Sequence, residues 1–160
     1  MGYSYKDTPI WTGRYLWTEG YDQFTIKVDG EGLKRNLHNF LPSFDLSNNF
    51  NTDYYMGVGK ILMEGMKEYV PYHKGTLSSS AYRDRGKSSD GIAISYAADY
   101  AEKVYDNPDG WNFRKTVHPL ATDHWDQAYL RDHEDEFLME VTDYTMDFLE
   151  KQGYNVQNVP

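Results

Sequence analysis

The residues of this chain that could best support chemistry are three histidines and two aspartates in its second half. Imidazole nitrogens and carboxylate oxygens both bind divalent ions, and the set comprises His118, Asp123, His124, Asp126 and His133. Their spacing argues against a metal site, because the HExxH pair of a zinc helix is missing and His124 and His133 would lie about 180° apart on a helix. We expect helix capping and surface hydrogen bonding from these side chains. A metal-dependent hydrolase that uses His118, Asp123 and His124 stays open as a less favoured alternative.

Two further motifs resemble ligand sites but lack essential groups. Residues 57–60 (Gly-Val-Gly-Lys) look like the end of a phosphate-binding loop, yet Tyr54 stands at the first glycine position and Ile61 where a hydroxyl would hold magnesium. Residues 106–110 resemble a calcium loop, but a proline occupies one of the alternate ligand positions. The serines at 78–80 are not part of a G-x-S-x-G elbow. The sequence therefore predicts no catalytic residue, no metal, no cofactor and no enzyme.

Aromatic side chains dominate the apolar composition. The chain has 15 Tyr and 4 Trp among 160 residues, and such rings bury apolar area while one polar atom stays in contact with water or a partner. The absence of Cys removes disulfides and is typical of a protein made in a reducing cytosol. No apolar stretch approaches the about 20 residues that cross a bilayer, so we expect no membrane contact. The composition favours an interaction protein, and a carbohydrate-binding or adhesion module is an alternative because aromatic faces stack on sugars.

Charge is distributed unevenly along the chain. The net charge is −9, and residues 121–150 are rich in acids with the single base Arg131, whereas bases outnumber acids in residues 60–87. Complementary patches of this kind can set the register in which copies associate. The alternative is a solvated acidic helix beside a basic loop. The basic segment is too small for tight sequence-independent binding of DNA.

Hydrophobic periodicity indicates the elements that position these residues. Alternation predicts a strand over 23–28 that ends in a turn at 29–32. Apolar residues at spacings of three and four predict helices, which we place at 33–41, 52–70 and 123–152. Two more strands, at 76–83 and 92–96, predict a hairpin with a basic tip, followed at 97–105 by a short helix or bent strand.

Together these elements predict an α+β fold. We expect a small antiparallel sheet of about three to four strands packed against a central helix and a long C-terminal helix, with an extended N-terminal arm. Glycines inside the central helix cost about 0.8–1 kcal/mol each relative to Ala, so their presence predicts close packing against a neighbour. We divide the chain into an aromatic N-terminal arm (1–20), a single α+β domain (21–153) and a C-terminal tail (154–160).

Three sequence blocks, in this order, form a recognisable pattern over about residues 55–150. They are Val70-Pro71 with Gly75-Thr76-Leu77-Ser78-Ser79-Ser80, then Tyr96-Ala97 with Tyr100-Ala101, and then Thr116-Val117-His118-Pro119-Leu120-Ala121 leading to Trp125. The combination resembles the small minor capsid proteins of tailed bacteriophages, within the wider group of phage neck and tail-completion proteins. The chain departs from that pattern in Lys74-Gly75-Thr76, where many relatives carry a Thr before the Gly, and in the extension over residues 1–50.

The resemblance implies a non-enzymatic virion protein, made in the host bacterial cytoplasm. Proteins of this kind assemble as a homo-oligomeric ring at the head–tail junction, which implies six- or twelve-fold symmetry here. The implied partners are other copies of the chain, the phage connector or stopper on one side, and tail terminator or tail tube proteins on the other. DNA would at most pass through the channel as cargo.

Two groups of residues are candidates for contacts within such a ring. The aromatic arm is expected to order on binding a partner, through Trp11, Tyr15 and Trp17. The basic hairpin tip is expected to meet acids of a neighbouring copy or of another neck protein, and this pairing joins Arg83, Arg85 and Lys87 to Glu134, Asp135 and Glu136.

Overall fold

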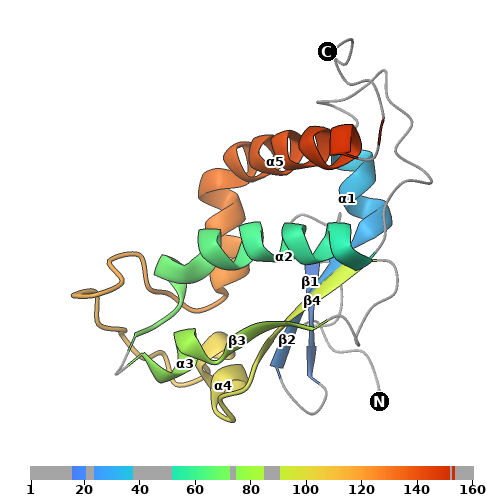
Figure 1. The fold of residues 1–160 in the computed structure, drawn as a ribbon. Helices are drawn as coiled ribbons and strands as arrows, with labels where there is room; N and C mark the ends of the chain where they lie inside the picture. The colour runs from blue at the N-terminus through green and yellow to red at the C-terminus, as the bar shows by residue number, and fades with distance from the viewer. Residues whose placement is uncertain are drawn as a thin grey trace.

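The computed structural model describes residues 16–20, 24–37, 52–72, 75–84, 91–151 and 153. In chain order its elements are β1 (Leu16–Gly20), β2 (Phe24–Asp29), α1 (Gly30–Leu37), α2 (Thr52–Met66), the 3₁₀ turn η2 (Lys67–Tyr69), α3 (Thr76–Ser79), β3 (Ala81–Asp84), β4 (Gly91–Tyr96), α4 (Ala101–Asp106) and α5 (Trp125–Lys151). The strands form one antiparallel sheet in the order β1-β2-β4-β3. Helix α2 crosses the sheet and α5 runs along α2 (Figure 1). The predicted α+β fold, with its small sheet, central helix and long C-terminal helix, is confirmed.

The two central strands supply much of the core. In the β2–β4 pairing Phe24 lies opposite Tyr96 and Ile26 opposite Ile94, and all four side chains are buried. Alternating positions also carry the buried Thr25–Ser95 pair, whose hydroxyl oxygens are 3.0 Å apart. The strands predicted at 23–28 and 92–96 are therefore confirmed. The β3–β4 hairpin pairing is confirmed as well, while its tip at 85–90 lies outside the described residues.

The strand predicted at 76–83 is wrong in its first half. Residues Thr76–Ser79 form the helical turn α3, and strand β3 begins only at Ala81. Gly75 starts the turn with a positive φ of 78°, and the hydroxyls of Ser79 and Ser80 donate to the carbonyls of Gly75 and Leu77, each at 2.7 Å. Short polar side chains that bond to nearby carbonyls stabilise a turn against an extended strand.

The turn predicted at 29–32 is also wrong, because helix α1 begins at Gly30. The carboxylate of Asp29 accepts a hydrogen bond from the Gly32 N–H at 3.1 Å, as an N-cap does. The helix predicted at 33–41 thus starts earlier, and residues 38–41 lie outside the described residues. Residues Leu16–Gly20, which the sequence placed in the arm, form the edge strand β1 paired with β2.

Helix α2 approaches its neighbours closely at its glycines, as predicted. A Cβ at Gly57 would overlap the Tyr144 ring of α5, and Gly65 likewise faces α5. On the opposite side of the helix, a Cβ at Gly59 would lie 3.0 Å from Ile92 of β4. The glycines therefore let one helix lie in direct contact with both the sheet and α5. The predicted helix 52–70 ends in the turn η2 before Val70 becomes extended.

Helix α5 confirms the long C-terminal helix predicted at 123–152 but contains a kink. His133 has non-helical backbone angles, with φ −138° and ψ 22°. The hydroxyl of Tyr69 donates to Asp132 at 2.9 Å, and the Tyr69 ring lies edge-on to those of Tyr129 and His133. Figure 1 shows the two halves of α5 running in different directions, so the kink sets the direction of the second half.

Candidate interaction surfaces

The three sequence blocks meet in the structure and hold one another in place. Trp125 is fully buried, and its Nε1–H donates to the hydroxyl of Tyr96 at 3.1 Å. The Thr122 N–H donates to the Tyr69 carbonyl at 3.0 Å, and the Ala97 N–H donates to the Ser80 carbonyl at 3.1 Å. Residues that are far apart in the sequence thus form one hydrogen-bonded cluster, a support on which the loop before α5 packs.

His118 belongs to this support. Its side chain is buried, its Nδ1 lies 2.7 Å from the Val70 carbonyl, and the Tyr72 ring packs edge-on against it. Because a carbonyl only accepts hydrogen bonds, Nδ1 carries the proton. The expectation that His118 forms surface hydrogen bonds is therefore wrong, since it bonds to the backbone inside the fold.

Asp126 is likewise a core residue. One carboxylate oxygen accepts a hydrogen bond from the Tyr105 hydroxyl at 2.6 Å, while its Oδ2 is buried without a partner among the described residues. Burial raises the pKa of Asp126, and the Tyr105 hydrogen bond acts in the opposite direction. His124 and Asp123 pair with each other at 2.9 Å. Within the described ranges, no group of His, Asp or Glu is arranged to hold a metal ion.

The loop at residues 111–120, which we call the aromatic loop, is built by specific contacts. Asn107 has a positive φ of 45°, and its side chain accepts from the Trp111 N–H at 2.7 Å and donates to the Trp111 carbonyl at 3.0 Å. The Lys103 ammonium lies 5.3 Å above the Trp111 ring. Farther along, the Lys115 ammonium donates to the Ala121 carbonyl at 2.7 Å. These bonds fix both ends of the loop.

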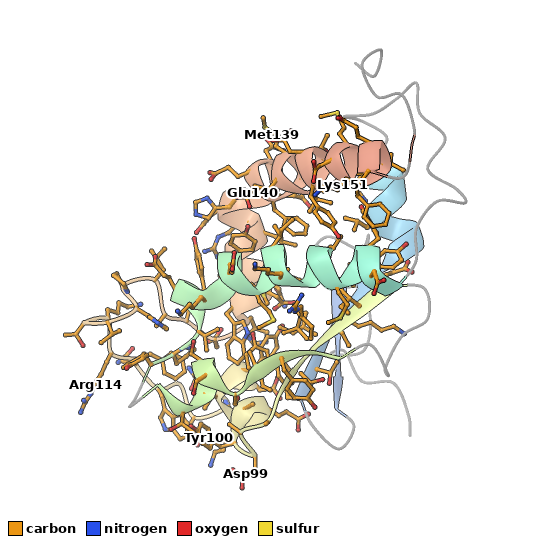
Figure 2. All side chains as sticks on the ribbon, in the orientation of Figure 1. Asp99, Tyr100, Arg114, Met139, Glu140 and Lys151 are labelled. Atoms are coloured by element: carbon orange, nitrogen blue, oxygen red, sulfur yellow. The ribbon has the colours of Figure 1, made fainter. Side chains whose placement is uncertain are left out.

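The aromatic loop exposes apolar and basic side chains. Trp111 is 45% exposed, Val117 54% and Leu120 44%. The stretch 110–122 contains Arg114 and Lys115 but no acid. Figure 2 shows Arg114 pointing away from the rest of the molecule. Residues 111–114 of the loop line one side of a cavity of about 250 Å³, whose other walls are Pro71, Tyr72, Leu77, Tyr100 and Val104.

A second exposed surface lies on α5 after the kink, and we call it the acidic face. It carries acids at helical spacings of three and four, namely Glu136, Glu140, Asp143, Asp147 and Glu150, all of them exposed. Among them lies Met139, which is 56% exposed. Lys151 is the single base in residues 137–151, and it pairs with Asp147 at 2.9 Å. Met139 is at the outer edge of the molecule in Figure 2.

The acids predicted to meet a basic partner lie at the kink of α5. Asp135 and Glu136 are exposed and Glu134 is half-buried. Residues 130–136 line a shallow hollow of about 510 Å³. The carboxylate of Glu136 is 2.9 Å from the Nδ1 of His133. Their position at the surface is compatible with a contact, and the contact itself stays a prediction.

The basic and aromatic residues predicted to face a partner are described only in part. Arg83 is half-buried, and its guanidinium donates to the Met56 carbonyl at 2.8 Å. The backbone of Trp17 belongs to β1. The others lie outside the described residues, and they are Trp11, Tyr15, Arg85 and Lys87. The predicted contacts of the hairpin tip and of the arm stay predictions.

Sequence reasoning missed the aromatic loop as a surface. The available signal was an acid-free stretch between acid-rich segments, with apolar residues that follow neither a helix nor a strand period. Such a stretch can equally be a buried connection. Only the exposure of Trp111, Val117 and Leu120 in the folded chain distinguishes the two.

Comparison with known proteins gives one family. A family model described as minor capsid protein matches residues 47–139, which is more than half of the chain and contains all three sequence blocks. No curated protein and no solved structure shows a significant match. Within the described residues, no helix is long and apolar enough to span a membrane.

Proposed function

The chain belongs to the minor capsid protein family, and on this premise we propose that it forms a homo-oligomeric ring at the head–tail junction of a tailed phage. Family membership makes it a structural protein of the phage virion and favours a non-enzymatic role over the hydrolase and carbohydrate-binding alternatives. In the proposed ring it joins the connector or stopper to tail terminator or tail tube proteins.

The family match is the observation that carries this proposal, and the surface of the molecule supports it. Rings close through heterologous contacts, in which one patch of a subunit meets a different patch of the next. The chain has two such dissimilar patches, because the aromatic loop is basic and apolar whereas the second half of α5 is acidic.

Electron microscopy of the intact particle tests the proposal directly. A tag fused to the C-terminus of the chain should appear as symmetric density at the neck, and separate images of the purified protein should show rings. Tag density distributed over the capsid lattice, or confined to the far end of the tail, would contradict a place at the head–tail junction.

The hairpin tip stays our proposal for a contact with a partner. Arg83 already bonds to Met56 within the fold, so a clean test leaves it in place and reverses the other two bases. We expect Arg85→Glu with Lys87→Glu to reduce incorporation into particles while the chain stays folded by circular dichroism. Lys60→Glu with Lys67→Glu, at exposed positions of α2 and of the turn η2, serves as the charge-matched control. Normal incorporation of the double variant would refute this contact.

A further inference from the structure

We propose that the aromatic loop of one copy docks on the acidic face of α5 in the next copy. This inference rests on the proposed ring, for which it names the contact between copies. It assigns a role to the aromatic loop and the acidic face, two exposed surfaces that no other described helix or strand covers.

Charge complementarity is the first argument. The loop carries Arg114 and Lys115 without any acid between residues 110 and 122, whereas Glu140 and Asp143 lie in a stretch of α5 whose single base is already paired. Opposite charges across an interface favour a defined register and disfavour like-to-like pairing of two loops or two acidic faces. A head-to-tail contact between copies satisfies both surfaces.

The apolar side chains match as well. Trp111, Val117 and Leu120 protrude from the basic surface, and Met139 protrudes from the acidic one. Interfaces place aromatic and Met side chains at their centre and charged groups at their rim, because the centre loses its water. The loop therefore offers an apolar anchor within a basic rim, and the helix offers a flexible apolar side chain within an acidic rim.

The loop is held in shape before it meets a partner. The two Asn107 hydrogen bonds fix the Trp111 backbone, and the Lys103 ammonium lies 5.3 Å from the centre of the exposed indole ring. Ordering a loop on binding opposes association, so a loop already ordered in the free subunit loses less entropy. This is the property expected of a subunit contact that must form repeatedly around a ring.

The two surfaces cannot meet within one molecule. Figure 2 shows Arg114 and Met139 at well separated points of the fold. A contact between them must join different copies, and it leaves one loop and one acidic face available at the two ends of every dimer. Such a contact continues until the ring closes.

Disulfide trapping tests the contact, because the chain has no cysteine of its own. We expect the double variant Val117→Cys with Met139→Cys to give a ladder of disulfide-linked oligomers under mild oxidation. Each single variant should give monomers and at most dimers. The matched control pairs Val117→Cys with Lys60→Cys, which is exposed on α2, and should give no ladder beyond dimers.

Charge exchange gives a second, independent readout. Arg114→Glu and Glu140→Lys should each weaken association by about tenfold or more, measured by sedimentation of the purified chain. The combined variant should recover association, because the two charges are exchanged across the same contact. Two additive losses without recovery would overturn the pairing.

The outcomes separate this contact from the proposed ring. If the unmodified chain assembles but the Val117–Met139 pair gives no ladder, the loop–helix contact is wrong and the ring proposal is unaffected. If the chain neither assembles nor forms a ladder at high concentration, the contact is also overturned, and the microscopy of the particle decides the ring by itself. A ladder without neck density in the particle would support the contact and contradict the location.

Discussion

The carboxylate of Asp126 is fully buried at the start of α5, close to the ring of Tyr105. One oxygen accepts the 2.6 Å hydrogen bond from the Tyr105 hydroxyl, and Oδ2 has no partner among the described residues. Burial raises the pKa of this carboxyl, although the Tyr105 hydroxyl, the Gln127 backbone and the nearby His124 favour the charged form. The native state therefore binds this proton more tightly than the unfolded chain does.

Asp126→Asn should change how stability depends on pH. Because the folded pKa lies above the ordinary value of 3.8, the wild-type free energy of unfolding falls as pH rises from that value through the folded pKa. The Asn side chain does not titrate, so the variant does not lose this part of its free energy of unfolding as the pH rises. The difference in melting temperature, variant minus wild type, should therefore increase between acidic and neutral pH in thermal unfolding followed by circular dichroism.

An exposed carboxylate provides the control for that experiment. Asp99 is exposed near the start of α4 and marks an outer edge of the molecule in Figure 2. Asp99→Asn makes the same chemical change outside the core and should change the melting temperature little. If the difference in melting temperature between Asp126→Asn and wild type stays constant with pH, the pKa of Asp126 is not raised in the folded state and the prediction is wrong.

Asn107 controls the entry to the aromatic loop through its backbone and its side chain together. Asn107→Ala removes both bonds to Trp111 and places alanine at a φ of 45°, which costs about 1–2 kcal/mol. We expect amide exchange at Trp111 to accelerate about fivefold, since a net hydrogen bond contributes about 1 kcal/mol. The melting temperature should fall as well.

Asn107→Gly separates the two effects. Glycine adopts the positive φ without strain but cannot form the side-chain bonds. It should therefore accelerate exchange at Trp111 like alanine, while its melting temperature falls less than that of the alanine variant. Equal loss of stability in both variants would show that backbone strain is not the reason for Asn at this position.

Helix α2 lies between the sheet and α5, and its glycines set the spacing. Gly57 faces Tyr144, whose hydroxyl donates to the Tyr54 carbonyl at 2.8 Å while the Tyr54 hydroxyl lies 2.8 Å from that of Thr145. The rings of Tyr54 and Tyr144 stack with centroids 5.3 Å apart. The helix pair is thus joined by aromatic packing and by hydrogen bonds that need close approach.

Gly57→Ala should destabilise the protein although alanine is the better helix former. The methyl group would overlap the Tyr144 ring, and overpacking typically costs about 1–3 kcal/mol, against an intrinsic helix gain of about 1 kcal/mol. In a Tyr144→Ala background the same change should become neutral or stabilising. Urea denaturation of the four proteins measures this coupling.

Glu64→Ala, on the exposed side of α2, is the control and should change stability by about 0.5 kcal/mol or less. If Gly57→Ala destabilises equally in both backgrounds, contact with Tyr144 is not the cause.

The kink of α5 determines how the second half of this helix is oriented. The hydroxyl of Tyr69 donates to Asp132, the residue before His133. Burial is the main cause that raises the pKa of Tyr69 to about 12, and the hydrogen bond to Asp132 is the second. The phenol therefore keeps its proton at physiological pH and can maintain the bond. By fixing Asp132, it helps to set the direction in which the acidic face extends.

For the whole molecule, the edge strand β1 changes how the N-terminal arm should be tested. Because Leu16–Gly20 pairs with β2, removal of residues 1–20 would take a strand from the sheet, whereas removal of residues 1–15 would leave it. We expect the shorter truncation to preserve the melting temperature but to abolish incorporation into particles. The longer one should lose about 2 kcal/mol or more, or roughly 4–8 °C.

These truncations distinguish a partner-binding arm from a part of the core. Thermal unfolding of the two purified chains and their recovery in particles are the measurements. A large loss of stability on removal of residues 1–15 would place the arm in the core. Normal incorporation of that shorter chain would remove its proposed role in binding a partner.

Much of the architecture follows from the sequence, because local patterns determine it. The alternation at Phe24, Ile26 and Val28 predicts a strand, and the apolar spacing of α5 predicts a long helix with one buried side. The ordered blocks around Pro71, Tyr96 and Trp125 resemble a family that the match over residues 47–139 confirms. Each signal is a pattern along the chain itself, so no tertiary information is needed to find it.

Only the tertiary structure decides which polar residues enter the core and which apolar ones remain outside. His118 and Asp126 look like surface groups in the sequence, but contacts with Val70 and Tyr105 bury them. The sequence near the kink at His133 contains no Pro or Gly, the residues that usually indicate a kink. The exposure of Trp111 likewise depends on residues brought together from distant parts of the chain. Burial is a property of the assembled neighbours, which local spacing does not specify.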